Sequence, residues 1–244
     1  MDKPILEVKN AIKTFGGLIA VNNVSFTVSP GEIFGVAGPN GSGKSTLFNL
    51  ITGIPYKPTS GEVWFDGSRI ERWPAHRISR AGLCRTFQKD TDFAGLDANE
   101  TVLVGAVYNG DCTRNECVKH VQETLDLVLF PKARREMRSS ELSVYERKQL
   151  MIASALVSKP KVLMLDEPAS GLSRPETAEL ENLLTTINKN GITIVIIEHV
   201  LSLLLSVSQR LMVLNEGSVL VEGHPEEVIK NNQVVEAYIG SRKV

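Results

Sequence analysis

One glycine-rich stretch, residues 38–46, constrains the fold of this chain more than any other segment. It reads GPNGSGKST and matches the phosphate-loop pattern G-x-x-x-x-G-K-[ST] at every constrained position. Residues 32–37 before it form an apolar run of strand length, and residues 46–51 after it have helical character. Because the motif requires a strand, a loop and a helix in this order, the flanks favour a phosphate-binding loop over a glycine-rich turn that matches by chance.

The residue types in this loop suit the binding of an anion. Glycines let successive backbone N–H groups converge on phosphate oxygens, and the helix that follows directs its positive end at the same anion. Lys44 is expected to bridge the β- and γ-phosphates of a nucleotide, and the Ser45 hydroxyl is expected to ligate Mg²⁺. The predicted ATP contacts in the loop are Gly38, Pro39, Asn40, Gly41, Ser42, Gly43, Lys44, Ser45 and Thr46.

Composition narrows the class of protein and its compartment. A length of 244 residues fits one α/β domain with room for an inserted subdomain. The net charge of −1 gives no signal for nucleic acid or for an anionic membrane surface. Three cysteines without C-x-x-C spacing, Cys84, Cys112 and Cys117, predict neither a disulfide framework nor a zinc site, and they favour a reducing compartment.

The sequence predicts neither export nor a membrane span. Residues 5–8 read as a strand and follow the first four residues without a charged-then-apolar leader. The most apolar stretch, residues 192–207, is interrupted by Glu198 and His199 and is shorter than the roughly 20 apolar residues that a bilayer span needs. We therefore expect a cytoplasmic protein whose membrane role must pass through a partner.

Strand and helix signals alternate along the chain around the phosphate loop. Residues 5–9 and 24–28 alternate apolar and polar side chains, as half-buried strands of an antiparallel layer do. Residues 162–165 and 192–197 are continuous apolar runs, typical of parallel strands covered on both faces. Further strands are predicted at 62–65 and 83–87, and helices at 74–80 and 113–129 and after the capping boxes at 97–100, 143–146 and 173–176.

The order of these elements predicts an α/β fold. Residues 1–88 and 160–244 are expected to form a phosphate-loop core with an antiparallel β layer, and residues 89–159 an inserted all-helical subdomain. In such sheets, ligands bind at the carboxyl ends of the parallel strands. Asp166, Glu167 and His199 follow the two buried strands, so we expect them at the same edge as Lys44.

Beside a phosphate loop, the polar residues at the strand ends can be assigned to metal binding, water activation and phosphate contact. Asp166 would orient Mg²⁺ through its water shell, and Glu167 would polarise a water in line with the γ-phosphate, although adjacent carboxylates also serve as helix caps. His199 is expected to contact the γ-phosphate, the alternative being an ordinary surface histidine. Gln88, at its own strand end, has an amide oxygen that could complete the Mg²⁺ shell.

Two further residues are candidate contacts for the nucleotide. Phe15 lies beside glycines in a loop before the phosphate loop, where an exposed ring could stack on a base. Core packing is the alternative for this ring. Val21 lies at the end of the same segment.

Taken together, the motifs resemble those of the ATP-binding cassette (ABC) ATPases. The phosphate loop, Gln88, Leu142-Ser143, residues 163–168 and Glu198-His199 stand in the order and approximate spacing of that family. The resemblance covers essentially the whole chain and implies a RecA-like core, with two such domains closing head to tail over two ATP molecules. It also implies that Ser143 faces the phosphate loop of the other subunit, and that Phe15 stacks on the adenine.

A narrower set of segments looks like the ATPase subunits of branched-chain amino acid importers. These segments are residues 15–18, 31–35, 85–88, 198–200 and 236–240. That resemblance implies membrane permeases, a second ATPase subunit that is either identical or different, and a substrate-binding protein outside. The chain would then lie on the inner face of the membrane through its permeases, with no nucleic acid partner.

Two departures from the family pattern lie at the surface that would face the partner's ATP. The usual signature LSGGQ is replaced by LSVYE at residues 142–146, and Ser173 stands where an acidic or amide residue is usual. Tyr145 is expected to obstruct close backbone approach, and Glu146 to add a negative charge unless it caps its helix. These departures predict that a homodimer of this chain hydrolyses ATP slowly. They also predict that the chain works best opposite a different subunit with an ordinary signature.

Two alternatives stay open beside the transporter ATPase. One is a catalytically weakened cassette that acts mainly as a structural partner, which the altered signature would explain. The other is a soluble ABC ATPase of DNA repair or translation, which would normally need a coiled-coil insertion or a tandem second cassette, and the sequence has neither.

Overall fold

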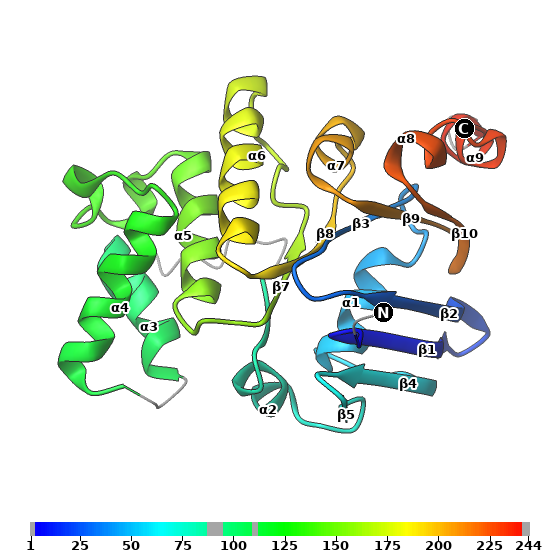
Figure 1. Cartoon of the computed structure of the whole chain (residues 1–244), viewed down its shortest axis with the longest axis horizontal. Helices are drawn as coiled ribbons and strands as arrows, with labels where there is room; N and C mark the ends of the chain where they lie inside the picture. Colours follow the sequence, from blue (N-terminus) through cyan, green and yellow to red (C-terminus); the bar gives the residue numbers. More distant parts are fainter. Residues whose placement is uncertain (1–2, 87–94, 109–111, 241–244) are drawn as a thin grey trace.

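The computed structural model describes residues 3–86, 95–108 and 112–240, and it arranges them around two β-sheets (Figure 1). In the larger sheet the strand order is β10-β9-β3-β8-β7-β6, and in the smaller sheet it is β2-β1-β4-β5. Neighbouring strands of the larger sheet pair in parallel, except that β10 is antiparallel to β9. The predicted α/β fold with an antiparallel layer is confirmed.

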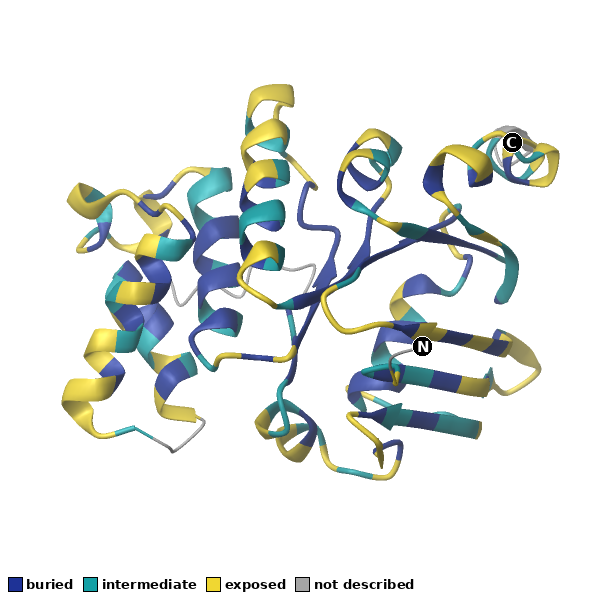
Figure 2. Cartoon of the chain, viewed as in Figure 1, coloured by how far each residue is buried: buried dark blue, intermediate teal, exposed yellow. Residues whose placement is uncertain are grey.

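Buried parallel strands form the middle of the larger sheet. Every residue of β3 (Ile33–Ala37), β7 (Val162–Asp166) and β8 (Thr193–Ile197) is buried, as Figure 2 shows. Their continuous apolar sequences are explained by cover on both faces. The other strands of this sheet are β6 (Leu83–Arg85), β9 (Arg210–Asn215) and β10 (Ser218–Gly223).

A smaller antiparallel sheet covers one side of the core. Strands β1 (Leu6–Phe15) and β2 (Leu18–Val28) form a long hairpin and are both longer than the sequence predicts. The sheet is completed by β4 (Ser60–Phe65) and β5 (Ser68–Arg69). Helix α1 (Lys44–Thr52) follows the phosphate loop, and its residues Leu47, Phe48 and Ile51 belong to one buried cluster with residues of both sheets.

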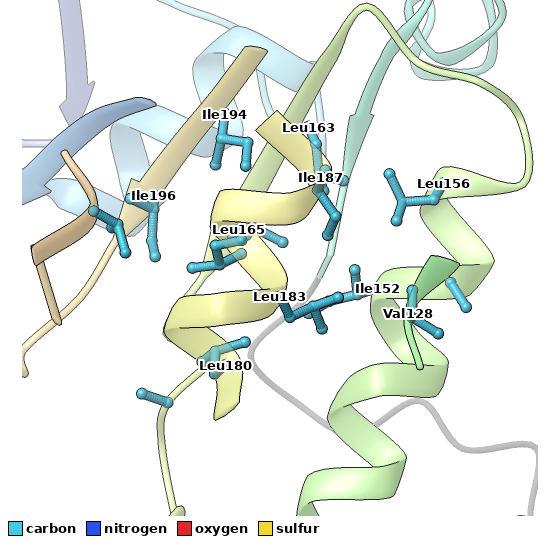
Figure 3. Close-up of a cluster of buried hydrophobic side chains, with 14 of the residues drawn as sticks. Val128, Ile152, Leu156, Leu163, Leu165, Leu180, Leu183, Ile187, Ile194 and Ile196 are labelled. Atoms are coloured by element: carbon cyan, nitrogen blue, oxygen red, sulfur yellow. The ribbon is translucent and has the colours of Figure 1, made fainter. Parts of the chain in front are cut away.

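Helices cover the opposite face of the larger sheet. Figure 3 shows side chains of β7 and β8 packed against α6 (Arg174–Lys189), which in turn packs against α5 (Val144–Leu156). Leu163, Leu165, Ile194 and Ile196 alternate with residues that face α1, so each strand contributes to both clusters. The remaining cover on this side includes α7 (Leu201–Val207).

The predicted helical region contains α3 (Ala98–Tyr108), α4 (Arg114–Leu127) and α5, which lie together at one end of the molecule in Figure 1. The expected capping boxes form at each of the three predicted sites, for example between Asp97 and Glu100. Shorter helices are α2 (Ala75–Arg80), α8 (Pro225–Val228), α9 (Asn232–Gly240) and the 3₁₀ turns Lys132–Arg134 and Ser139–Glu141.

The structure corrects one prediction about the cysteines. Cys112 and Cys117 form a disulfide across the start of α4, with Cα atoms 5.4 Å apart, whereas the sequence predicted no disulfide. Spacing failed as a guide because the bond depends on how the turn before α4 folds back, which places the two side chains together. Cys84 is free and buried.

Over the described residues, no helix combines the length and the apolar character that crossing a bilayer requires.

Candidate functional site

A pocket of about 580 Å³ lies where the phosphate loop meets the ends of β7 and β8. It brings together residues from five separate segments of the chain. Its lining consists of Phe15, Leu18, Ile19, Ala20, Asn40, Gly41, Ser42, Gly43, Lys44, Ser45, Thr46, Glu167, His199, Glu216 and Gly217. The predicted convergence of Lys44, Glu167 and His199 at one edge of the sheet is therefore observed.

Two glycines of the loop hold positions that no other residue could take. Gly38 has a φ of 147°, and a Cβ there would lie 2.2 Å from the carbonyl oxygen of Leu214. Gly43 has a φ of 101°, and a Cβ would lie 2.5 Å from the carbonyl oxygen of Ala20. Since backbone atoms cannot yield, glycine is required at both positions for the loop to fit between β2 and β9.

The Lys44 ammonium is buried beneath the loop. Its Nζ donates hydrogen bonds to the carbonyl oxygens of Gly38 at 2.8 Å and Pro39 at 2.9 Å. Burial lowers the pKa of Lys44, while the carboxylates of Glu167 and Asp166 oppose that effect. The loop thus holds its cation in a fixed position facing two carboxylates.

Asp166 ends β7 and forms a buried ion pair. Its Oδ2 lies 2.6 Å from Nη2 of Arg85, whose Nη1 donates to Oδ1 of Asn49 at 2.7 Å. Of the atoms that the structure describes, Oδ1 of Asp166 is a buried oxygen with no hydrogen-bond partner. One oxygen is therefore fixed by arginine, and the other is left with unused capacity to accept.

Glu167 combines an unusual backbone with a short side-chain contact. Its φ is 51°, a left-handed conformation that is uncommon for a residue with a Cβ. Its Oε1 lies 2.5 Å from Nε2 of His199, and its backbone N–H donates to the carbonyl of Ile197 at 2.9 Å. The two predicted catalytic side chains therefore touch, and they join the ends of neighbouring strands β7 and β8.

A buried carboxylate that the sequence did not suggest as functional stabilises the segments that follow β7 and β8. Glu198 is 1% exposed, and its carboxylate accepts backbone N–H groups of Ala169 at 2.5 Å and His199 at 3.0 Å. Burial raises the pKa of Glu198, and these backbone hydrogen bonds oppose the rise. Glu198 thereby ties the segment after Glu167 to the segment that carries His199.

Phe15 and Val21 take different positions. Phe15 is 42% exposed and lines the pocket, where its ring meets Tyr56 edge to face with centroids 5.0 Å apart. The alternative of core packing for Phe15 is wrong. Val21, in contrast, is fully buried in β2, so its side chain does not line the pocket, and Ala20 lies there instead. The strand pairing of β2 decides this, because adjacent residues face opposite sides.

Ser143 and the three altered signature residues, Val144, Tyr145 and Glu146, do not line this pocket. Ser143 is exposed and caps α5: its Oγ accepts from the Glu146 N–H at 3.2 Å, and the Glu146 Oε2 accepts from the Ser143 N–H at 2.8 Å. Glu146 also pairs with Arg134. The capping alternative for Glu146 is therefore confirmed, and its negative charge is already paired.

Tyr145 is partly exposed and partly packed within its own chain. Its side chain is half-buried and packs against the main hydrophobic cluster, near Glu176 and Glu179 of α6. That burial raises the pKa of Tyr145 to about 12. Part of its side chain is therefore used in packing within its own chain, and its predicted obstruction of a partner stays a prediction.

Gln88 and Ser173 are the remaining positions that the sequence singled out. Gln88 lies outside the described residues. Ser173 is occupied in capping α6, since its Oγ donates to Oε2 of Glu176 at 2.6 Å. Arg85 and Glu198 were missed as site residues. Glu198 directly follows a predicted strand and precedes His199, which is the signal that could have found it. Arg85 lay inside the predicted strand 83–87, whereas the observed strand β6 ends at Arg85.

Comparison with known proteins gives a consistent picture. A family model described as "ABC transporter" matches residues 21–170. The chain is 36% identical to the high-affinity branched-chain amino acid transport ATP-binding protein BraF of Pseudomonas aeruginosa, covering 98% of this chain and 99% of the relative. It is 37% identical to the corresponding protein LivG of Escherichia coli K12, again over 98% and 99%.

Solved structures agree with these relatives. A nucleotide-free ATP-binding cassette from an ABC transporter superposes with a TM-score of 0.90 at 30% identity, covering 98% of this chain and 100% of that chain. A cassette in its ADP conformation superposes with a TM-score of 0.88, also at 30% identity and with the same coverage.

Proposed function

The chain belongs to the ABC transporter ATPases, and from that premise we propose that it binds ATP with Mg²⁺ and powers the uptake of branched-chain or related amino acids. As a member of this family it is a nucleotide-binding ATP hydrolase and a subunit of a transporter. The observation that carries the catalytic part is the contact of Glu167 with His199 in the pocket that the phosphate loop lines.

Mg²⁺ fits the residues at the end of β7. Asp166 offers a buried oxygen, Oδ1, without a hydrogen-bond partner, and Ser45 offers an exposed hydroxyl on the pocket wall. Two protein oxygens suit Mg²⁺, which usually keeps waters and shares substrate phosphates. When bound, the ion would neutralise charge on the phosphate oxygens. The predicted third ligand, Gln88, is proposed on the resemblance alone.

Glu167 and His199 are proposed as the reacting pair. Glu167 accepts the proton of the attacking water, and His199 contacts the γ-phosphate. Their 2.5 Å contact supports this assignment, because it holds both side chains at the mouth of the same pocket. The left-handed backbone of Glu167 supports it as well, since strain of this kind is retained where function needs it.

Binding of the nucleotide is assigned to the loop and to Phe15. Lys44 contacts the β- and γ-phosphates, with residues 38–46 supplying backbone N–H groups. The exposed ring of Phe15 stacks on the adenine, and the edge-to-face contact with Tyr56 restricts the orientation of the Phe15 ring.

A complete site is proposed to need a second ATPase subunit, identical or different. Ser143 supports this because it caps an exposed helix end and is absent from the pocket lining of its own chain. Membrane permeases and an external substrate-binding protein complete the proposed assembly, which would place the chain on the inner face of the membrane. The relatives' printed names support the amino acid cargo.

Replacing the Glu167 carboxylate by an amide tests whether this residue is the proton acceptor. Glu167→Gln keeps the shape and removes the proton acceptor, so ATP turnover should fall by about 10²- to 10⁴-fold while ATP binding persists. Steady-state phosphate release and titration with a fluorescent ATP analogue measure the two quantities. Glu226→Gln, on exposed α8, is the matched control and should leave both unchanged. Equal turnover by wild type and Glu167→Gln would reject this role, and turnover near zero in wild type would favour a weakened cassette.

A further inference from the structure

Helix α9 carries the segment at residues 236–240 and takes no part in the nucleotide pocket. It lies beside α8 at the β10 end of the larger sheet, as Figure 1 shows. Val234 anchors it, being 3% exposed within the main hydrophobic cluster, and Tyr238 packs partly buried against the same cluster. Between α9 and residues 39–42 of the phosphate loop lies a second cavity of about 380 Å³.

One polar contact joins this helix to the phosphate loop. The hydroxyl oxygen of Tyr238 accepts a hydrogen bond from the backbone N–H of Gly38 at 2.8 Å, across 200 residues of sequence. Burial raises the pKa of Tyr238, while the bond from Gly38 opposes the rise, so the hydroxyl is neutral at physiological pH.

Gly38 needs such an external restraint. A glycine has little conformational preference of its own, so the groups bonded to its N–H and its carbonyl decide its backbone angles. The N–H bonds to Tyr238, and the carbonyl accepts a hydrogen bond from Nζ of Lys44 at 2.8 Å. Gly38 therefore connects the tyrosine hydroxyl directly to the lysine that faces the nucleotide phosphates.

We propose that Tyr238 is a positioning residue for the phosphate loop: its hydroxyl fixes Gly38, so that the Gly38 carbonyl holds the Lys44 ammonium in place for the phosphates. The C-terminal helix then contributes to nucleotide affinity without touching the nucleotide. This role rests on the proposed binding of ATP at the loop.

Removing one oxygen atom tests the role. Tyr238→Phe keeps the ring and its packing, and it should weaken binding of a fluorescent ATP analogue to the full chain by about 3- to 10-fold, the range expected for one lost hydrogen bond. Tyr108→Phe is the matched control, because Tyr108 is 52% exposed on α3, and it should bind like wild type.

Hydrogen exchange separates positioning from general stabilisation. In the chain without nucleotide, the Gly38 amide proton should exchange faster in Tyr238→Phe, whereas the amides of β7 should exchange as in wild type. An equal acceleration in β7 would make Tyr238 a merely structural residue and would overturn the proposal, as would unchanged Gly38 exchange.

The failures of the two proposals are distinct. If wild type binds the ATP analogue and Tyr238→Phe binds it equally well, the positioning role alone is refuted. If wild type does not bind it, the proposed ATP site fails and the positioning role fails with it.

Discussion

Helices α1 and α5 begin in opposite ways, although both present an N-terminus to a proposed phosphate site. Helix α1 has Gly43 as its N-cap, with no side-chain capping bond and no acidic residue in its first turn. Helix α5 has Ser143 and Glu146 in a reciprocal capping box. The first helix leaves its backbone N–H groups and its positive end available to an anion. The second uses its own side chains to satisfy the N–H groups of Ser143 and Glu146.

Electrostatics follows the same division. Beside α1, the Lys44 ammonium is held under the loop and faces the carboxylates of Asp166 and Glu167. Beside α5, the Glu146 carboxylate is paired with Arg134. The N-terminus of α1 is therefore arranged to bind nucleotide in the single chain. The N-terminus of α5 is stabilised by its own capping box and would contact nucleotide only in an assembly with a second subunit.

The largest effect is expected from removing the lysine of the phosphate-loop end. Lys44→Ala should weaken binding of the fluorescent ATP analogue by roughly 10²-fold, because charged hydrogen bonds to the phosphates are lost. Lys119→Ala, on the exposed surface of α4, is the control and should bind normally. Retained affinity in Lys44→Ala would show that the open helix end is not the nucleotide site.

A carboxylate in the first turn of α1 should make the N-terminus of this helix less able to bind an anion, as Glu146 does in α5. Thr46→Glu places an acid three residues after the N-cap, and it should weaken ATP binding by about 10-fold more than the neutral Thr46→Gln, because it repels the phosphates. The thermal midpoint of Thr46→Glu should be no lower than that of Thr46→Gln, since an acid in the first turn favours the helix. Equal affinities of the two variants would contradict the comparison.

Removing the cap of α5 should cost stability and leave binding intact. Ser143→Ala should reduce the free energy of unfolding by about 1 kcal/mol, a fall in the thermal midpoint of about 2–4 °C, while the single chain binds ATP as before. Ser68→Ala, at an exposed position in β5, controls for loss of a hydroxyl. Weaker ATP binding by the monomeric Ser143→Ala chain would place Ser143 in the site of its own chain.

The smallest effect concerns Tyr145 and alkaline pH. Its pKa of about 12 in the folded chain lies above the ordinary value of 10, so the unfolded chain ionises first as pH rises. Stability is therefore fully present below about pH 10 and is lost progressively towards about pH 12. From about pH 9 to about pH 11, the thermal midpoint of wild type should fall more than that of Tyr145→Phe. Parallel falls would mean that the Tyr145 hydroxyl is not buried in the folded chain.

Elements whose signals are local could be predicted from the amino-acid sequence alone. The phosphate loop, the buried runs at β7 and β8 and the three capping boxes are read from periodicity and residue type within a few positions. Because parallel strands share an edge, the sequence also predicted that Lys44, Glu167 and His199 would meet.

Contacts between distant segments depend on how the elements pack in three dimensions. The pairing of Arg85 with Asp166, the bond from Gly38 to Tyr238 and the packing of Tyr145 against the main hydrophobic cluster join residues whose spacing in sequence carries no signal. The burial of Val21 in place of Ala20 depends on strand register, where a shift of one residue exchanges the two faces. These details arise when whole elements pack together, because the free energy of a side chain then depends on neighbours that its local sequence does not specify.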